Sequence, residues 1–511
     1  MQIRSLAYLV TICVAGASSA QDQPLSVIDW VKRNPDQPAM TSTLLPNRFE
    51  PPVTPGALVP PVTVKPLGEQ TRRIIGLVPA AVTGLPETLW TGSTPKSLVD
   101  QLKDMPSLRL PAAQALLYTV LLTETEGPGT DAAGDDLMTL ARVDTLMRFG
   151  AHDPALALLE QAGITRDARH FASYMNVALL SGQEDTACAI LQSQSHLAPS
   201  LAHASFCAAR QGDWPTAALY FDTGHSLGAI TGPEADALER FLHPESFEDS
   251  APLERPSEIT PLLFRLHEAI GEPMPTGVLP LAYAVADLRD LAGWKSQLEA
   301  AERLSVTGAL PANRLLGLYT ARQPAASGGI WDRVAAVQRF ETALRTRSDA
   351  AISKSLPPAW KAMQSVGLDL IFADLFTASL ARYALADSAA EVSRQMHLLS
   401  ANYNDLAHDE TVPTLQRAIL NGKTTDIRTR TPIQAALIDG FDIKNARQDL
   451  TMMARNGRMG EAILRALVLL DDGASGDPVA LRQALSTLRS FGLEDTIRRA
   501  ALQVLLLERF G

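Results

Sequence analysis

The chain has 511 residues, of which 46% are hydrophobic and only 5% aromatic, and its formal net charge is −11. An acidic balance of this size disfavours nucleic acid and anionic lipid as broad-surface partners. Abundant alanine and leucine with few aromatic rings favour close helix packing over a β-sandwich, whose strands need more β-branched and aromatic residues.

Residues 1–20 have the pattern of a secretory signal peptide. Arg4 gives a short positive start, residues 6–15 are apolar, and Ser18 and Ala20 put small side chains where a signal peptidase requires them. The apolar stretch is shorter than the ~20 residues that span a bilayer. The pattern therefore predicts cleavage after Ala20, export to the periplasm, and a mature chain without a membrane span.

Residues 21–94 are predicted to form a proline-rich arm. Between Gln21 and Pro111 lie 15 of the 34 prolines of the chain. Because proline fixes φ and removes a backbone donor, we expect an extended or irregular segment with no core of its own. Trp90 is the expected anchor of this segment. Thr94-Pro95 marks the start of the first regular helix, with threonine as the cap and proline at the first helical position.

A unit of two helices recurs farther along the chain. One helix ends in glycine, a polar turn follows, and a small residue stands in the next helix five positions after the glycine. Looser copies begin at Asn456 and Phe491. This register is typical of stacked helical hairpins, because one hairpin cannot bury its apolar face alone. The pairs of the three clearest copies are Gly150 and Ala155, Gly182 and Ala187, and Gly212 and Ala217.

The predicted fold class is therefore all-α, with an α-solenoid of stacked helical hairpins after the arm. We expect a helical-repeat region at residues 95–243 and a second helical region at residues 258–511 that continues the solenoid. The acidic segment from His243, which carries three prolines, separates the two regions.

The glycine–alanine register resembles that of the tetratricopeptide (TPR) and Sel1-like helical repeats, mainly over residues 137–224. The resemblance implies TPR-like hairpins and an interaction surface for other proteins. As a whole, the chain resembles exported alphaproteobacterial proteins of unknown function, some of which carry a label of antifreeze-glycopeptide type, although it has no Ala-Ala-Thr tract. This second resemblance implies a location and a shape, and no reaction.

Two cysteines remain once the signal peptide is removed. Cys188 and Cys207 lie at equal distances from a turn at residues 197–198, and two antiparallel helices joined there would bring them side by side. Paired thiols oxidise in an exported protein. The sequence therefore predicts a Cys188–Cys207 disulfide that stabilises the fold by roughly 3 kcal/mol. The alternative is two buried thiols that act as small apolar side chains.

The chain contains fragments of catalytic motifs and no complete set. Residues 93–96 have the S-x-x-K form of serine acyl-enzymes, but residues 423–425 lack the glycine of the matching K-T-G element. Ser93 and Thr94 are better explained as helix caps. The histidine–acid pairs are adjacent or nearly so, instead of standing four residues apart on one helix face. We expect no catalytic residue, no cofactor and no metal ligand.

The predicted function is that of a non-enzymatic exported scaffold or adaptor, which holds an envelope protein or peptide on its helical-repeat surface. The alternative is a cell-envelope enzyme that acts on peptidoglycan or another glycan. Candidate partner-binding residues are hydrogen-bond donors and one aromatic ring outside the packing positions of the repeats. They are Arg142, Arg148, Arg169, Tyr174, Asn176 and Arg210.

Overall fold

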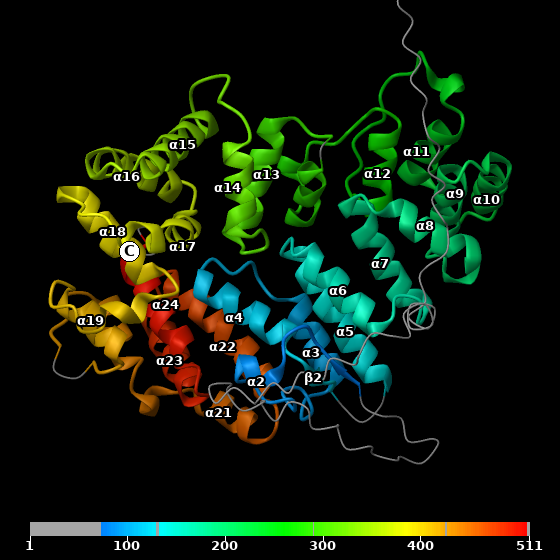
Figure 1. The fold of residues 1–511 in the computed structure, drawn as a ribbon. Helices are drawn as coiled ribbons and strands as arrows, with labels where there is room; N and C mark the ends of the chain where they lie inside the picture. Colours follow the sequence, from blue (N-terminus) through cyan, green and yellow to red (C-terminus); the bar gives the residue numbers. More distant parts are fainter. Residues whose placement is uncertain (1–72, 129–131, 290, 425–426, 508–511) are drawn as a thin grey trace, which may run out of the picture. The chain divides into compact units, whose positions relative to one another are not determined.

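A computed structural model of the protein describes residues 73–128, 132–289, 291–424 and 427–507. Contacts between residues divide the chain into Met1–Glu69 and Gln70–Gly511, and every described residue belongs to the second unit. The predicted signal peptide and most of the predicted proline-rich arm therefore lie outside the described residues (Figure 1).

The first described segment holds short elements ahead of the first long helices. The strand β1 (Ile74–Ile75) pairs antiparallel with β2 (Thr125–Glu126), and the single-turn helix α2 covers Ala80–Thr83. Two longer helices follow, α3 (Pro95–Lys103) and α4 (Pro111–Leu122). The Thr94 side chain accepts a hydrogen bond from the Ser97 amide at the start of α3, which confirms the predicted cap.

Trp90 anchors this first segment, as the sequence predicts. Its side chain is fully buried, and its ring lies against Gly460, where an added Cβ would come within 2.4 Å of the ring. The Gly460 amide also donates to the Leu89 carbonyl at 2.9 Å. A glycine is therefore required at position 460 for the backbone of one segment to approach the tryptophan of the other.

The predicted hairpin units are present in the structure. The glycines of the three clearest units, Gly150, Gly182 and Gly212, have φ of 82°, 78° and 83°, a left-handed conformation that glycine adopts without strain. The paired Ala155, Ala187 and Ala217 are fully buried. The helices of these units are α5 (Ala132–Arg148), α6 (His152–Ala162), α7 (Ala168–Ser181), α8 (Glu184–Ser193), α9 (Leu201–Arg210) and α10 (Trp214–Ser226).

The remaining described residues are also helical or in loops. Within the described ranges, strand pairing is limited to β1 and β2 and one isolated bridge, so the all-α prediction is confirmed. The two looser repeat units correspond to the last two helix pairs. The helices after α10 are α11 (Gly232–Leu242), α12 (Pro261–Ala269), α13 (Trp294–Val306), α14 (Ala312–Thr320), α15 (Ile330–Thr346), α16 (Asp349–Gln364), α17 (Asp369–Leu380), α18 (Asp387–Leu399), α19 (Thr414–Asn421), α20 (Pro432–Asp439), α21 (Gln448–Arg455), α22 (Met459–Ala474), α23 (Pro478–Ser490) and α24 (Glu494–Leu506).

Short 3₁₀ helices connect several of these elements. They are η2 (Ser195–Leu197), η3 (Pro244–Phe247), η4 (Thr276–Val278), η5 (Leu281–Leu288), η6 (Tyr403–Leu406) and η7 (Ile443–Asn445). Among the helices that the structure describes, none combines the length and the apolar character needed to cross a bilayer.

The last helices pack against the first ones. Helices α22 and α24 contact α4, and α22 also contacts α3. An Asp471 carboxylate oxygen on α22 accepts hydrogen bonds from the Arg109 and Leu110 amides at 2.5 and 2.9 Å, and Gln503 on α24 accepts one from the Ala112 amide at 2.8 Å. These acceptors satisfy backbone donors at the start of α4, which lacks a side-chain cap of its own. Contacts between the last and the early helices, which the repeat pattern of the sequence does not predict, therefore join the two ends of the helix series.

Charged side chains connect the helices before and after the predicted boundary near His243. Arg265 on α12 forms ion pairs with Glu184 on α8 and with Glu268 one turn away. Arg240 on α11 pairs with Glu272 at 2.9 Å. The division into regions 95–243 and 258–511 stays a prediction, but helices from the two ranges share a partly buried ion network.

Candidate functional site

Arg142 is buried in the structure, whereas the sequence predicted that it lies outside the packing positions. Its side chain is 2% exposed, and its three nitrogens donate to the carbonyls of Leu121, Ile75 and Thr123 at 2.5, 2.9 and 3.1 Å. Burial lowers the pKa of Arg142 to about 10. The guanidinium therefore ties the β1–β2 pair and the end of α4 to α5.

Arg148 and Tyr174 also serve the fold. Arg148 donates to carbonyls at the end of α3, among them those of Lys103 at 3.1 Å and Met105 at 3.3 Å, where a cation is favoured by the helix dipole. Tyr174 is 4% exposed and its ring centroid lies 5.9 Å from that of Phe171. The buried Tyr174 ring thus differs from the expectation that it lies outside the packing positions.

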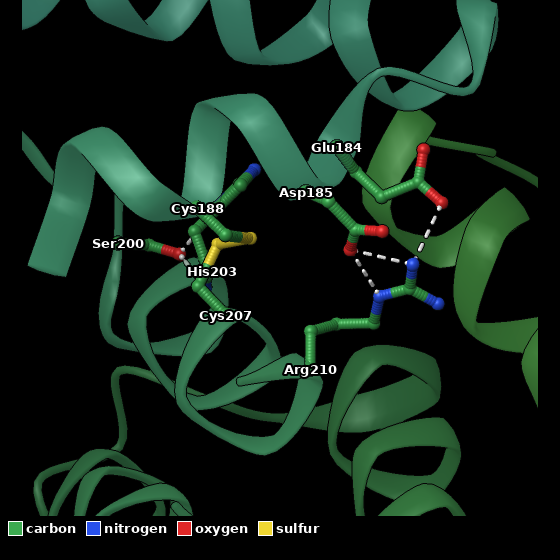
Figure 2. The surroundings of a disulfide bond; sticks show 7 residues. All are labelled: Glu184, Asp185, Cys188, Ser200, His203, Cys207 and Arg210. Atoms are coloured by element: carbon green, nitrogen blue, oxygen red, sulfur yellow. Dashed lines mark hydrogen bonds and ion pairs between the residues drawn. A yellow bond between two sulfur atoms is a disulfide. The ribbon is translucent and has the colours of Figure 1, made fainter. Parts of the chain in front are cut away.

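The other three predicted residues do not form one surface. Arg169 is exposed and pairs with Asp167 at 3.0 Å, whereas Asn176 is half-buried in α7. Arg210 pairs with Asp185 at 2.6 Å and with Glu184 at 3.5 Å (Figure 2). The structure therefore does not gather the six predicted residues on one surface. Each of the three arginine side chains with a partly exposed head group (Arg148, Arg169 and Arg210) is already engaged by the protein.

The predicted pair Cys188–Cys207 is joined by a disulfide in the structure, between α8 and α9 (Figure 2). The two Cα atoms are 4.9 Å apart, and both residues are buried. Both cysteines line a cavity of about 200 Å³, together with polar residues such as Gln192 and Asp213. The disulfide thus fixes the two helices against each other beside a small polar hollow.

The residues of the S-x-x-K motif are engaged in structural contacts. The Ser93 hydroxyl donates to the Glu461 carboxylate at 3.1 Å, and Lys96 pairs with Asp100 at 2.6 Å. Serine and lysine are therefore held by different partners. Thr94 caps α3 as predicted, whereas the Ser93 hydroxyl bonds to Glu461 and does not cap the helix. Within the described ranges, no three histidine, cysteine, aspartate or glutamate side chains are grouped as metal ligands would be.

Helices α15 and α16 form a groove between them. Its volume is about 520 Å³, and every lining residue belongs to one of these two helices. We call it the α15–α16 groove. It is lined by Ala336, Arg339, Thr342, Ala343 and Thr346 of α15 and by Ala351, Lys354, Ser355 and Pro358 of α16.

The two helices form an antiparallel hairpin with a tight turn. Arg347 ends α15 in a left-handed conformation with φ of 53°, and the Ser348 side chain then caps α16 by accepting from the Ala351 amide. Such a turn directs the second helix back along the first. Residues at equal distances from Arg347 therefore lie across the hairpin from each other.

An adjoining face of the hairpin is packed against the rest of the protein. The Phe340 ring lies 5.3 and 5.0 Å from the rings of Phe372 and Phe376 on α17, and Ile352 and Leu356 of α16 are fully buried. This aromatic cluster packs the hairpin against α17. Apart from Arg339 and Lys354, the groove face carries small side chains, and these leave the space between the two helices open.

Proline shapes the α16 side of the groove. Helix α16 contains Pro357 and Pro358, and Pro358 lines the groove together with Lys354. Proline has no amide hydrogen, so Pro358 cannot donate to the carbonyl of Lys354 four residues earlier. The Lys354 carbonyl therefore lacks its usual helical donor.

The charge in the groove is positive. Arg339 and Lys354 are its charged lining residues, and neither forms an ion pair with a carboxylate among the residues that the structure describes. Nearby Glu341 is engaged by Arg345 on the same helix. In a chain with 56 acidic and 45 basic residues, two cations that share a cavity without an acidic partner are a distinct local feature.

This groove could not be predicted from the sequence, because residues 261–420 contain helices without a clear repeat register. The signal was present at helical spacing, with Ala336, Arg339, Ala343 and Thr346 on one face of α15. A stripe of this kind indicates a groove only when the helix that packs beside it is known.

The described part of the protein thus defines an all-α protein of paired helices with a cationic interhelical groove. Comparisons with protein-family models, with curated proteins and with solved structures found no match to this chain. The hairpin architecture is compatible with a helical-repeat fold, and a relation to the tetratricopeptide or Sel1-like repeats stays a prediction.

Proposed function

We propose that this protein is an exported, non-enzymatic scaffold that holds a segment of a partner polypeptide in the α15–α16 groove. The observation that carries the proposal is the groove itself, a hollow of about 520 Å³ formed by two antiparallel helices whose adjoining face is packed. Grooves between helices are a common way for proteins to bind peptides, because apolar side chains of the ligand fill the hollow.

Export is supported by the signal-peptide pattern of residues 1–20 and by the disulfide between Cys188 and Cys207. Disulfides persist in oxidising compartments and are rare in the cytosol. A periplasmic or extracellular partner follows from this part of the proposal.

Groove-dependent binding can be measured with a displayed library of random peptides and the purified mature protein. The groove is blocked by Thr342→Trp, since Thr342 is exposed on its rim. The matched control is Arg345→Trp, at an exposed position of the same helix that does not line the groove. We expect peptides that bind the wild type and the control and lose at least tenfold in affinity for Thr342→Trp.

Two results would contradict the proposal. One is a selection in which every enriched peptide binds Thr342→Trp as well as it binds the wild type. The other is release of soluble fragments from purified peptidoglycan at a rate above that of a heat-inactivated sample, which would favour a glycan-cleaving enzyme over a scaffold.

A further inference from the structure

The positive charges of the groove lie at matching heights on its two walls. Arg339 is eight residues before the turn residue Arg347, and Lys354 is seven residues after it. At a rise of about 1.5 Å per residue, both Cα atoms stand roughly 11 Å along the helix axes from the turn. Arg339 and Lys354 therefore face each other across the groove.

We propose that the occupant of the α15–α16 groove is an acidic amphipathic helix of a partner protein, with carboxylates on both flanks of a narrow apolar ridge. This inference rests on the proposed function and specifies the partner's chemistry. The ridge would enter the hollow, one flank would meet Arg339, and the other would meet Lys354.

The shape of the groove favours a helix as the occupant. Its α15 side extends from Ala336 to Thr346, which is roughly 15 Å or about three helical turns. Ala336, Ala343 and Ala351 carry only a methyl group, so a third helix can approach closely and place residues i, i+3, i+4 and i+7 between the two walls.

The charge of the groove favours carboxylates on that helix. Arg339 and Lys354 have no acidic partner among the described residues, and no lining residue is acidic. A bound helix with glutamates on both flanks supplies the missing partners at the rim, where water still reaches the pairs. Such exposed pairs contribute modestly and are screened by salt, so they select the partner more than they set its affinity.

The probe is a fluorescein-labelled 17-residue helical peptide with a leucine and alanine ridge and glutamates on both flanks. A twin peptide has lysine at every glutamate position, and helicity of both is checked by circular dichroism. We expect the full mature protein to bind the acidic peptide and to bind its lysine twin at least tenfold more weakly. Raising the salt concentration from 50 to 500 mM should weaken binding of the acidic peptide.

The cations are tested one at a time with matched controls. Arg339→Gln and Lys354→Gln should each weaken binding of the acidic peptide by about twofold to fivefold. Arg345→Gln on α15 and Lys361→Gln on α16 change the same charge outside the groove lining and should leave affinity unchanged. All four positions are exposed, so the variants should fold.

The decisive measurement is a charge exchange. The double variant Arg339→Glu/Lys354→Glu should no longer bind the acidic peptide and should bind the lysine twin instead, because the charge of the groove has changed from positive to negative. Equal binding of the two peptides by the wild type, or a double variant that does not change the preference, would overturn the inference.

The library selection separates this inference from the proposed function. Groove-dependent peptides without an excess of acidic residues would retain the scaffold and reject the acidic partner. Selection of no groove-dependent peptide would reject both. Binding to vesicles of anionic lipid that is lost in the Arg339→Gln and Lys354→Gln variants, with no binding of the acidic peptide, would replace the polypeptide partner by a membrane surface.

Discussion

The Ser93 hydroxyl donates a hydrogen bond of 3.1 Å to Oε2 of Glu461, 368 residues farther along the chain. Glu461 is fully buried in α22, and its other oxygen accepts from the Ser97 hydroxyl at 3.0 Å. Arg458 and Arg465 pair with the same carboxylate at 2.7 and 2.8 Å. Burial alone would raise the pKa of Glu461, but its hydrogen bonds and ion pairs outweigh burial and lower it. One carboxylate thus connects the start of α3 and the residue before its cap to α22.

Replacement of Glu461 should therefore destabilise the folded protein. We expect Glu461→Ala to lower the free energy of unfolding by about 2–4 kcal/mol, because two hydroxyls and two guanidinium groups lose their shared acceptor. The matched control is Glu341→Ala, which removes an exposed pair with Arg345 and should cost less than about 1 kcal/mol. Urea unfolding followed by circular dichroism measures both, and equal midpoints for the two variants would contradict the assigned role of Glu461.

The disulfide should contribute measurably to stability. It closes a loop between residues 19 positions apart, and loop-closure entropy predicts about 3 kcal/mol for a loop of this size. We expect the Cys188→Ala/Cys207→Ala variant to unfold at lower urea concentration than the oxidised wild type. Reductant should shift the wild type toward the variant and leave the variant itself unchanged. A variant that still responds to reductant would show that the effect arises elsewhere.

Two histidines should make stability depend on pH. Burial lowers the pKa of His152 and of His203 from 6.5 to about 4. For His152, the Gly150 carbonyl and Asp153 oppose this shift without cancelling it. Because the folded pKa is below the unfolded value, the unfolded chain binds more protons between pH 6.5 and 4. Stability should be constant above pH 6.5 with respect to these groups and fall as the pH drops toward 4, by on the order of 2 kcal/mol per histidine.

Substitution of the two histidines separates their contribution to the pH dependence of stability from that of other titrating groups. The double variant His152→Gln/His203→Gln should lose less stability than the wild type between pH 7 and pH 4.5, whatever its stability at pH 7. His196→Gln removes an exposed histidine of the same region and serves as the control. Parallel curves of unfolding free energy against pH for the double variant and the wild type would contradict the prediction.

Substitution of two repeat glycines by alanine distinguishes the energetic cost of a left-handed backbone from the cost of steric crowding. Gly182 and Gly212 have φ of 78° and 83°, but an added Cβ would lie 2.7 Å from the Arg289 side chain at position 182 and would meet nothing within 4 Å at position 212. We expect Gly212→Ala to cost about 1 kcal/mol from the left-handed backbone alone. Gly182→Ala should cost more, because Arg289 must also move from its ion pair with Glu268. Thermal unfolding of the two variants gives the comparison.

Local rules explain why the hairpins could be predicted from the sequence. The left-handed turn after a helix requires glycine, and the close approach of two helices requires a small residue such as Ala155, so both requirements appear as residue types at fixed spacing. The Cys188–Cys207 pair follows the same local logic, since its partners flank a single turn.

Long-range contacts explain what the sequence did not reveal. Arg142 looks like an exposed cation in the sequence, because its carbonyl acceptors at Ile75 and Leu121 belong to other segments. In the same way, Arg339 and Lys354 become neighbours only through the hairpin turn at Arg347. The sequence predicted the pairing of adjacent helices, and the site depends on which faces those pairs leave uncovered.

The packing of α3 and α4 against α22 and α24 has a consequence for biosynthesis. Helices α3 and α4 bury part of their apolar surface only after α22 and α24 have been made. The same is true of their hydrogen bonds to Glu461, Asp471 and Gln503. Contacts of such large sequence separation form late, because loop closure must come first. Emerging chains should thus keep these early helices exposed to chaperones until α22 and α24 have been synthesised.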